Sequence, residues 1–150
     1  MGPPDTTLRE ITKKTVRSIT ALDVGPDQQG LVAPNAISIA EAYFEPKAWF
    51  RAIYFGEEPA GFAMVHRDPD EREFYIWRFM VDARFQGRGV GGRALELLLD
   101  QARADGVDEV TLSVVPGDRS AMGFYEKYGF EATGVVEHGE AEMRLRLAAT

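Results

Sequence analysis

The stretch that decides the fold is Arg84–Arg93, which reads Arg-Phe-Gln-Gly-Arg-Gly-Val-Gly-Gly-Arg. It follows Phe74–Val81, an aromatic and β-branched run typical of a central strand. It leads into Val90–Ala104, where apolar residues recur with the helical period before Gly106. Glycines at such a junction let the backbone approach a ligand, and unpaired N–H groups at a helix start favour an anion. With three arginines and no acid in the stretch, the sequence predicts a phosphate-binding turn.

Other interpretations of this turn stay open at this point. Gly87, Gly89 and Gly92 formally match the dinucleotide fingerprint G-x-G-x-x-G. That fingerprint belongs to a multi-stranded parallel fold, whereas here much other structure precedes it and few parallel strands can follow. The Gly-Lys-Ser/Thr of a P-loop is absent. A glycine-rich helix start that binds no ligand is the remaining alternative.

The rest of the chain alternates strand and helix patterns and extends the prediction to a mixed α/β fold. Counting the two elements above, we expect about seven strands in a mostly antiparallel central sheet, about four helices, and one or two crossover helices. We expect one domain over residues 1–150, with residues 1–6 disordered. The other expected strands are Thr7–Ile11, Phe50–Phe55, Ala60–His66, Glu109–Val115, Phe130–Val136 and Ala141–Leu147, and the other helices are Val16–Leu22, Ile37–Phe44 and Arg119–Tyr128.

Composition narrows the class of protein. The chain has 150 residues, about the size of one domain, and a net charge of -7 at pH 7. A negative chain repels nucleic-acid phosphates and attracts cations, so we expect no nucleic-acid partner. The absence of cysteine excludes disulfides, thiolate metal sites and a covalent cysteine nucleophile. The only two histidines, His66 and His138, are far apart in sequence, which predicts no metal site.

No membrane segment or targeting signal is expected. The longest uncharged stretch, Gln28–Ala40, is interrupted by Pro34 and is too short to span a bilayer. No basic, apolar and small-residue sequence of a signal peptide opens the chain. Together with the absence of cysteine, this favours a cytoplasmic location.

Two motifs resemble those of a known family. Gln86-x-x-Gly89-x-Gly91 is similar to the pyrophosphate-binding signature Gln/Arg-x-x-Gly-x-Gly/Ala of the GNAT superfamily of N-acetyltransferases. Asp118–Phe130 resembles the family's later motif, Asn-x-x-Ala-x-x-Phe/Leu-Tyr-x-x-x-Gly-Phe, with Asp118 in place of the usual Asn. With the strand before them, the two motifs cover roughly residues 74–130. The resemblance implies the GNAT fold, with acetyl-coenzyme A (acetyl-CoA) as co-substrate and a primary amine as acceptor.

The same resemblance implies roles for individual residues. Tyr125 falls at the family's general-acid position. A phenol, with a pKa of about 10, can stabilise or protonate the leaving thiolate, whose thiol has a pKa of about 8.5. One backbone N–H of the central strand is expected to polarise the thioester carbonyl. Backbone contacts to the pantetheine arm are implied for Phe79, Met80 and Val81, a cofactor contact for Asp118, and pyrophosphate contacts for Gln86, Gly87, Arg88, Gly89, Val90, Gly91 and Gly92.

The acceptor side is less well defined by the motifs. Tyr75–Met80, together with Val32–Pro46, resembles bacterial spermidine/spermine (diamine) N-acetyltransferases. Polyamine acetyltransferases often carry a carboxylate on the strand before the glycine turn, but Trp77 and Arg78 stand there. An attacking amine must lose a proton. The candidate bases are Glu41, Glu45, Glu73 and Asp82, or a chain of water molecules.

Glu41 and Glu45 are four residues apart, which on one helix would place them on the same face. With Tyr43 and Trp49 nearby, they could line a pocket for a cationic chain, and a solvated acidic face is the alternative. We therefore expect Glu41, Glu45, Glu73 and Trp77 on the substrate side, a polyamine acceptor, and direct transfer in a ternary complex. The alternatives are a protein amine, an aminoglycoside-like drug, or a catalytically silent CoA-binding module. Homodimerisation, common in the family, is a further expectation.

Overall fold

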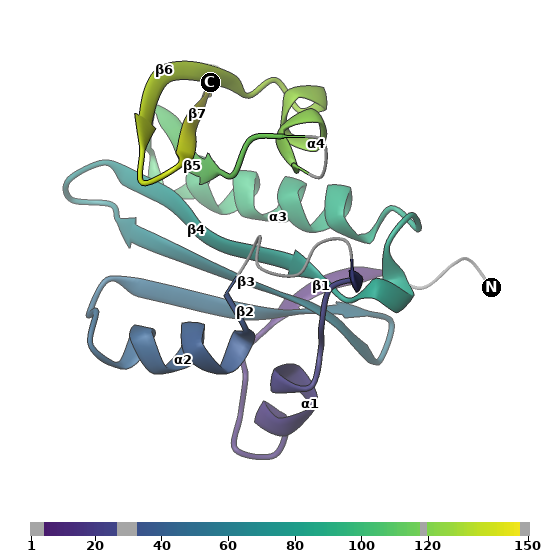
Figure 1. Cartoon of the computed structure of the whole chain (residues 1–150). Coiled ribbons are helices and arrows are strands. Elements are labelled where there is room, and N and C mark those ends of the chain that lie inside the picture. Colours follow the sequence, from purple (N-terminus) through teal and green to yellow (C-terminus); the bar gives the residue numbers. More distant parts are fainter. Residues whose placement is uncertain (1–4, 27–32, 118–119, 148–150) are drawn as a thin grey trace.

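The computed structural model describes residues 5–26, 33–117 and 120–147, which form one sheet with helices on both faces (Figure 1). Within these residues there are seven strands and four α-helices, which confirms the predicted mixed α/β fold. In chain order the elements are β1 (Thr6–Arg9), α1 (Val16–Thr20), α2 (Asn35–Tyr43), β2 (Ala48–Phe55), β3 (Glu58–Asp68), β4 (Glu73–Val81), α3 (Val90–Asp105), β5 (Glu109–Val114), α4 (Met122–Lys127), β6 (Glu131–Glu137) and β7 (Glu140–Arg146).

The sheet has the strand order β1-β2-β3-β4-β5-β7-β6. Every neighbouring pair is antiparallel except β4 and β5, which run parallel. Parallel neighbours require the chain to cross back over the sheet, and α3 makes this crossing (Figure 1). The carboxyl ends of β4 and β5 therefore point the same way, at the centre of the sheet.

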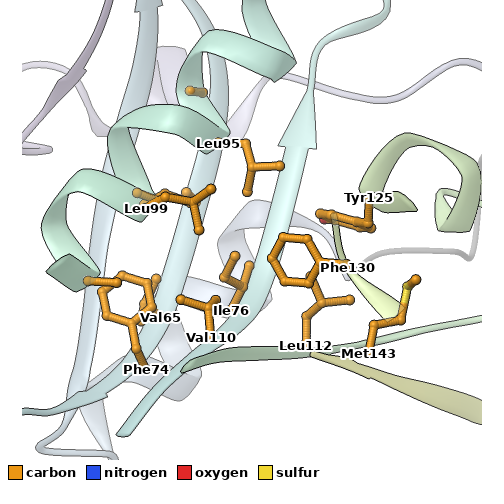
Figure 2. Packing of buried hydrophobic residues seen from close by; sticks show 14 of the residues in the cluster. Val65, Phe74, Ile76, Leu95, Leu99, Val110, Leu112, Tyr125, Phe130 and Met143 are labelled. Atoms are coloured by element: carbon orange, nitrogen blue, oxygen red, sulfur yellow. The ribbon is translucent and has the colours of Figure 1, made fainter. Parts of the chain in front are cut away.

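Two apolar cores cover the opposite faces of the sheet. On one face, Leu95 and Leu99 of α3 pack over Val65 and Ile76, as Figure 2 shows. Figure 2 also shows the rings of Tyr125 and Phe130 beside this core, where α4 joins it. On the other face, buried side chains of β2 and β3 pack against α1 and α2; this core contains Ile19, Leu22, Ala52, Tyr54, Phe62, Met64 and Met80, with Ile39 and Ala42 against it.

The structure changes several expected boundaries. Strand β1 begins at Thr6, which pairs with Phe55, so the expected disordered start does not include Thr6; residues 1–4 lie outside the described residues. Helix α4 begins at Met122 rather than at residue 119, which is also outside them. A short 3₁₀ helix, Ala83–Phe85, was not predicted; the Asp82 side chain caps it by accepting a hydrogen bond from the Arg84 N–H.

Candidate active site

A bulge in β4 creates the space in which the candidate site lies. In the β3–β4 register, Met64 pairs with Arg78 but Val65 pairs with Ile76, so Trp77 is an extra residue in β4. A bulge bends the strand that contains it and changes which face its side chains point to. In a regular strand, Ile76 and Met80 would point to the same face, because they are four residues apart. Here Ile76 packs in the core beneath α3, whereas Met80 belongs to the core on the opposite face.

Beyond the bulge, β4 and β5 separate. The two strands pair only at Tyr75–Thr111 and Ile76–Leu112. From Trp77 onward, the β4 edge that faces β5 has no strand partner within the described part of the chain. The Trp77 and Val81 carbonyls accept hydrogen bonds from the side chains of Arg78 and Gln86. The other N–H and C=O groups of this edge are available to an extended ligand, as they would be to another strand.

A cavity of about 1080 Å³ opens where the strands part. This volume is at the upper end of the range usual for small-molecule sites. Its walls come from β4, β5, the turn before α3, and α4. Of the residues expected at the site, the cavity is lined by Trp77, Phe79, Met80, Val81, Gln86, Gly87, Gly89, Gly91, Gly92 and Tyr125.

The glycine turn is shaped by backbone conformations that favour glycine. Gly87 and Gly89 have φ angles of 78° and 82°, in the left-handed region that residues with a Cβ rarely adopt. Gly89 is the N-cap of α3, and the first hydrogen bond of the helix runs from the Arg93 N–H to the Gly89 carbonyl. The N–H groups before Arg93 have no partner within the helix, so they and the helix dipole favour an anion.

Side chains around the turn hold it against β4. The Gln86 Nε2 donates to the Val81 carbonyl at 2.9 Å, which closes the end of the strand. Arg88 is exposed, and its guanidinium lies 5.6 Å from the ring of Phe55 and 5.7 Å from that of Phe85. Val90 is fully buried in the core. Thus the side chains of Arg88 and Val90, two of the expected pyrophosphate-binding residues, do not line the cavity.

Gly92 makes a contact that the motif did not suggest. A Cβ on Gly92 would lie 2.0 Å from the Tyr128 hydroxyl oxygen and 3.1 Å from Tyr128 Cζ. A side chain at position 92 would therefore have to displace the Tyr128 hydroxyl, whereas the backbone conformation of Gly92 itself is an ordinary helical one. This contact seats the end of α4 on the first turn of α3.

Tyr125 is almost entirely buried, at 6% exposure, and lies within an aromatic cluster. Its ring is 5.1 Å from the ring of Phe124, 5.6 Å from that of Phe130 and 6.4 Å from that of Phe79. Burial raises the pKa of the Tyr125 phenol, because the phenolate would lose its solvation, so the hydroxyl keeps its proton at neutral pH. Tyr125 is thus a protonated donor at the wall of the cavity.

The expected carboxylates occupy three different environments. Glu45 and Glu73 both contact the His66 ring, at the start of β4 and away from the cavity, which neither lines. The buried Asp82 carboxylate accepts hydrogen bonds from the N–H groups of Asp23 and Arg84 and from the Arg84 guanidinium. Burial alone would raise the pKa of Asp82, but these hydrogen bonds outweigh it and keep the pKa below its usual value, which makes Asp82 a poor base.

Glu41 reaches the cavity only through a neighbour. Its carboxylate accepts a hydrogen bond from Arg78 Nη2 at 3.1 Å, and Arg78 lines the cavity beside Trp77. The buried Arg78 Nε has no hydrogen-bond partner among the described residues. Tyr43 is 84% exposed on the outside of α2 and is not a pocket residue.

Several cavity residues were missed by the sequence analysis. They come from the end of β5, from α4 and from the segment before α2, and include Ser113, Val114, Val115, Phe124, Tyr128, Val24 and Pro34. The β5 residues could have been found, because parallel neighbours joined by a crossover helix end at the same edge of a sheet. The expected contact residue Asp118 lies outside the described residues.

Neither a metal cluster nor a membrane-spanning helix occurs in the described part of the chain. In these ranges, no three His, Cys, Asp or Glu side chains are grouped so as to hold a metal ion. In the same ranges, every helix is too short or too polar to cross a bilayer.

Known proteins share this sequence pattern and this fold. A spermine/spermidine N(1)-acetyltransferase of Bacillus subtilis (strain 168) is 25% identical over 148 residues, which cover 91% of this chain and 95% of that protein. A mycothiol acetyltransferase of Corynebacterium glutamicum is 31% identical over 111 residues, covering 73% of this chain but 37% of that protein.

Solved structures show the same architecture. An acetyltransferase from Thermus thermophilus has a TM-score of 0.74 at 20% identity and covers 98% of this chain and 100% of that one. The PaiA N-acetyltransferase from Thermoplasma acidophilum, in complex with coenzyme A, has a TM-score of 0.74 at 12% identity, with 95% and 99% covered. The sequence itself matches the model of the acetyltransferase (GNAT) family over residues 16–130. The chain therefore belongs to the GNAT family, as its motifs predicted, and is an acetyl-CoA-dependent N-acetyltransferase.

Proposed function

We propose that the protein transfers the acetyl group of acetyl-CoA directly to a primary amine in a ternary complex, and that the amine is a polyamine such as spermidine or spermine. The main support is the cavity between β4 and β5, which brings the glycine turn, a free strand edge and the protonated Tyr125 to one space. The absence of cysteine argues against an acyl-cysteine intermediate.

The residues of the cavity fit the cofactor in two parts. The N–H groups of Gly87–Gly92, at the positive end of α3, suit the doubly charged diphosphate. The edge of β4 at Phe79–Val81 suits the amides of the pantetheine arm, because these can pair with a strand. The Val81 carbonyl, however, already accepts a hydrogen bond from Gln86. At Val81, therefore, we expect only the N–H to bind the pantetheine arm.

When bound, acetyl-CoA supplies an acyl group on a thioester with a thiolate leaving group. An N–H of the β4 edge donates to the thioester oxygen as negative charge develops there. The neutral amine nitrogen bonds to the thioester carbon, the C–S bond breaks, and the Tyr125 hydroxyl donates its proton to the departing sulfur; the proton that the amine nitrogen loses passes through water and restores the Tyr125 hydroxyl. Burial raises the pKa of Tyr125, so at neutral pH its hydroxyl is protonated and can act as a hydrogen-bond and proton donor to the sulfur.

The polyamine acceptor is supported by a relative and by the charge around the cavity. The relative from Bacillus subtilis is named for spermine and spermidine but is only 25% identical. The net charge of -7 attracts cations at long range, and Trp77 and Glu140 line the cavity, where they can contact an alkylammonium. Arg78 opposes this attraction, although its charge is partly balanced by Glu41.

Release of free CoA thiol from acetyl-CoA tests the acceptor. Spermidine, spermine, a lysine-containing peptide and an aminoglycoside should be assayed in parallel. Turnover with the polyamines alone supports the proposed acceptor, whereas turnover with the peptide or the drug alone replaces it. Tight CoA binding without turnover of any amine would instead indicate a silent CoA-binding module.

Exchange of Tyr125 tests the mechanism. Tyr125→Phe should retain CoA affinity and lower kcat by about 100- to 10,000-fold, the usual range for general acid–base catalysis. Tyr43→Phe, on the exposed end of α2, is the matched control and should leave kcat unchanged. An unchanged kcat in Tyr125→Phe would remove this residue from the mechanism. A cytoplasmic location, a homodimer and the absence of a nucleic-acid partner stay predictions.

A further inference from the structure

The hydroxyl of Tyr128 lies at the positive end of α3. Tyr128 follows directly after α4, and its oxygen is 2.0 Å from the position that a Cβ on Gly92 would take. Gly92 is in the first turn of α3, whose early N–H groups have no partner within the helix. The Tyr128 side chain also lines the cavity.

No hydrogen bond in the described part of the chain accounts for this hydroxyl. Among the described residues it makes no hydrogen bond, although it is only partly exposed. The ring packs against Phe124, with 5.4 Å between the centroids, and a phenylalanine could make this contact equally well. The oxygen also lies where a Cβ on Gly92 would be, so the hydroxyl touches the first turn of α3 without making a hydrogen bond there.

We propose that the Tyr128 hydroxyl donates a hydrogen bond to the diphosphate of CoA, beside the backbone N–H groups of α3. A phenol is an effective donor to a phosphate oxygen, and bonds to a charged acceptor are stronger than neutral ones. This role rests on the proposed position of the diphosphate at Gly87–Gly92. It adds a side-chain ligand, from a different helix, to a site otherwise formed by the backbone.

The test compares acetyl-CoA with acetyl-pantetheine, a donor that lacks the diphosphate together with the 3′-phosphoadenosine attached to it. Wild type and Tyr128→Phe are assayed with acetyl-CoA and with acetyl-pantetheine, and their Kd for CoA is measured by calorimetry. Tyr128→Phe should weaken CoA binding about tenfold and lower kcat/KM for acetyl-CoA similarly, the size expected for one hydrogen bond to a charged group. Its kcat/KM for acetyl-pantetheine should equal that of wild type. Tyr43→Phe is again the control.

The outcomes separate this inference from the proposed function. If the wild-type enzyme has the same kcat/KM for acetyl-pantetheine as for acetyl-CoA, the proposed position of the diphosphate is wrong, and the role of Tyr128 with it. Wild-type enzyme that prefers acetyl-CoA, with the full preference kept in Tyr128→Phe, would overturn the role of Tyr128 alone. Equal losses with both donors would also overturn it, because they would indicate a structural defect.

Discussion

Adding a single methyl group at Gly92 should reveal how tightly α4 is seated on α3. Gly92 lies in helical backbone without a positive φ, so alanine is conformationally acceptable there and would by itself contribute up to about 1 kcal/mol of helix propensity. The new Cβ would, however, lie 2.0 Å from the Tyr128 oxygen. Overpacking of this kind costs about 1–3 kcal/mol. Gly92→Ala should therefore destabilise the protein by roughly 1–2 kcal/mol.

Removal of the Tyr128 hydroxyl should relieve most of this cost. Without the oxygen, the nearest atom to the new Cβ is Tyr128 Cζ at 3.1 Å, which a shift of a few tenths of an ångström relieves. Gly92→Ala should then be close to neutral in a Tyr128→Phe background. The coupling free energy between the two changes should be about 1–2 kcal/mol, within the range for residues in contact.

Urea unfolding of wild type, the two single variants and the double variant measures this coupling, provided that the m values agree. Gly123→Ala in α4 is a suitable control, because a Cβ there has no neighbour within 4 Å. It should not destabilise the protein in either background. An equal loss of stability from Gly92→Ala in both backgrounds would show that the hydroxyl contact is not what excludes a side chain at position 92.

Three further changes test other parts of the structure. Gly89→Ala forces alanine to a φ of 82°, so it should cost about 1–2 kcal/mol in urea unfolding and raise the Kd for CoA in calorimetry. Asp105→Asn breaks the hydrogen bonds of 2.6 and 2.7 Å from Arg67 and should cost about 2 kcal/mol. These bonds hold the pKa of Asp105 below its usual value, so they stabilise the folded protein at neutral pH. This stabilisation is lost as the pH falls below about 4 and Asp105 is protonated. The free energy of unfolding of Asp105→Asn should therefore depend less on pH in this acid range than that of wild type. The double change Glu45→Gln, Glu73→Gln should leave KM for spermidine unchanged in the thiol-release assay, because neither residue lines the cavity; a clear rise in KM would place the acceptor near His66.

The parts of the fold that depend on local pattern were predictable from the sequence. The strand Phe74–Val81, the glycine turn and the amphipathic helix after it each show their own periodicity or backbone requirement, and the family motifs added their order. The bulge at Trp77 could not be predicted in the same way. It is defined only by the register against β3, in which Ile76 and Arg78 have successive partners.

Of the four expected acceptor residues, Trp77 lines the cavity, whereas Glu41, Glu45 and Glu73 do not, for a related reason. Glu41 and Glu45 were placed on one helix face by their spacing, but α2 ends at Tyr43, so Glu45 is not part of the helix. Glu73 starts β4 and is about 13 Å from Trp77 along a strand that rises about 3.3 Å per residue. Sequence spacing gives a distance along one element, whereas the composition of a cavity depends on where several elements meet.

Tyr125 and Tyr128 show how two side chains from one short segment can act together at the cavity. They are three residues apart at the end of α4, so both side chains project to the same side, toward the cavity. Helix α4 has only six residues, and besides the Ser120 hydroxyl, which accepts a hydrogen bond from the Met122 N–H, its position depends on its contacts with α3 and β4. A diphosphate held jointly by the first turn of α3 and Tyr128 would fix α4 and, with it, the proton donor Tyr125. Binding energy from a part of CoA remote from the thioester would then be used to position the acid. On this basis, acetyl-pantetheine should show a lower kcat as well as a higher KM in wild type, since a donor without a diphosphate leaves α4 less firmly held.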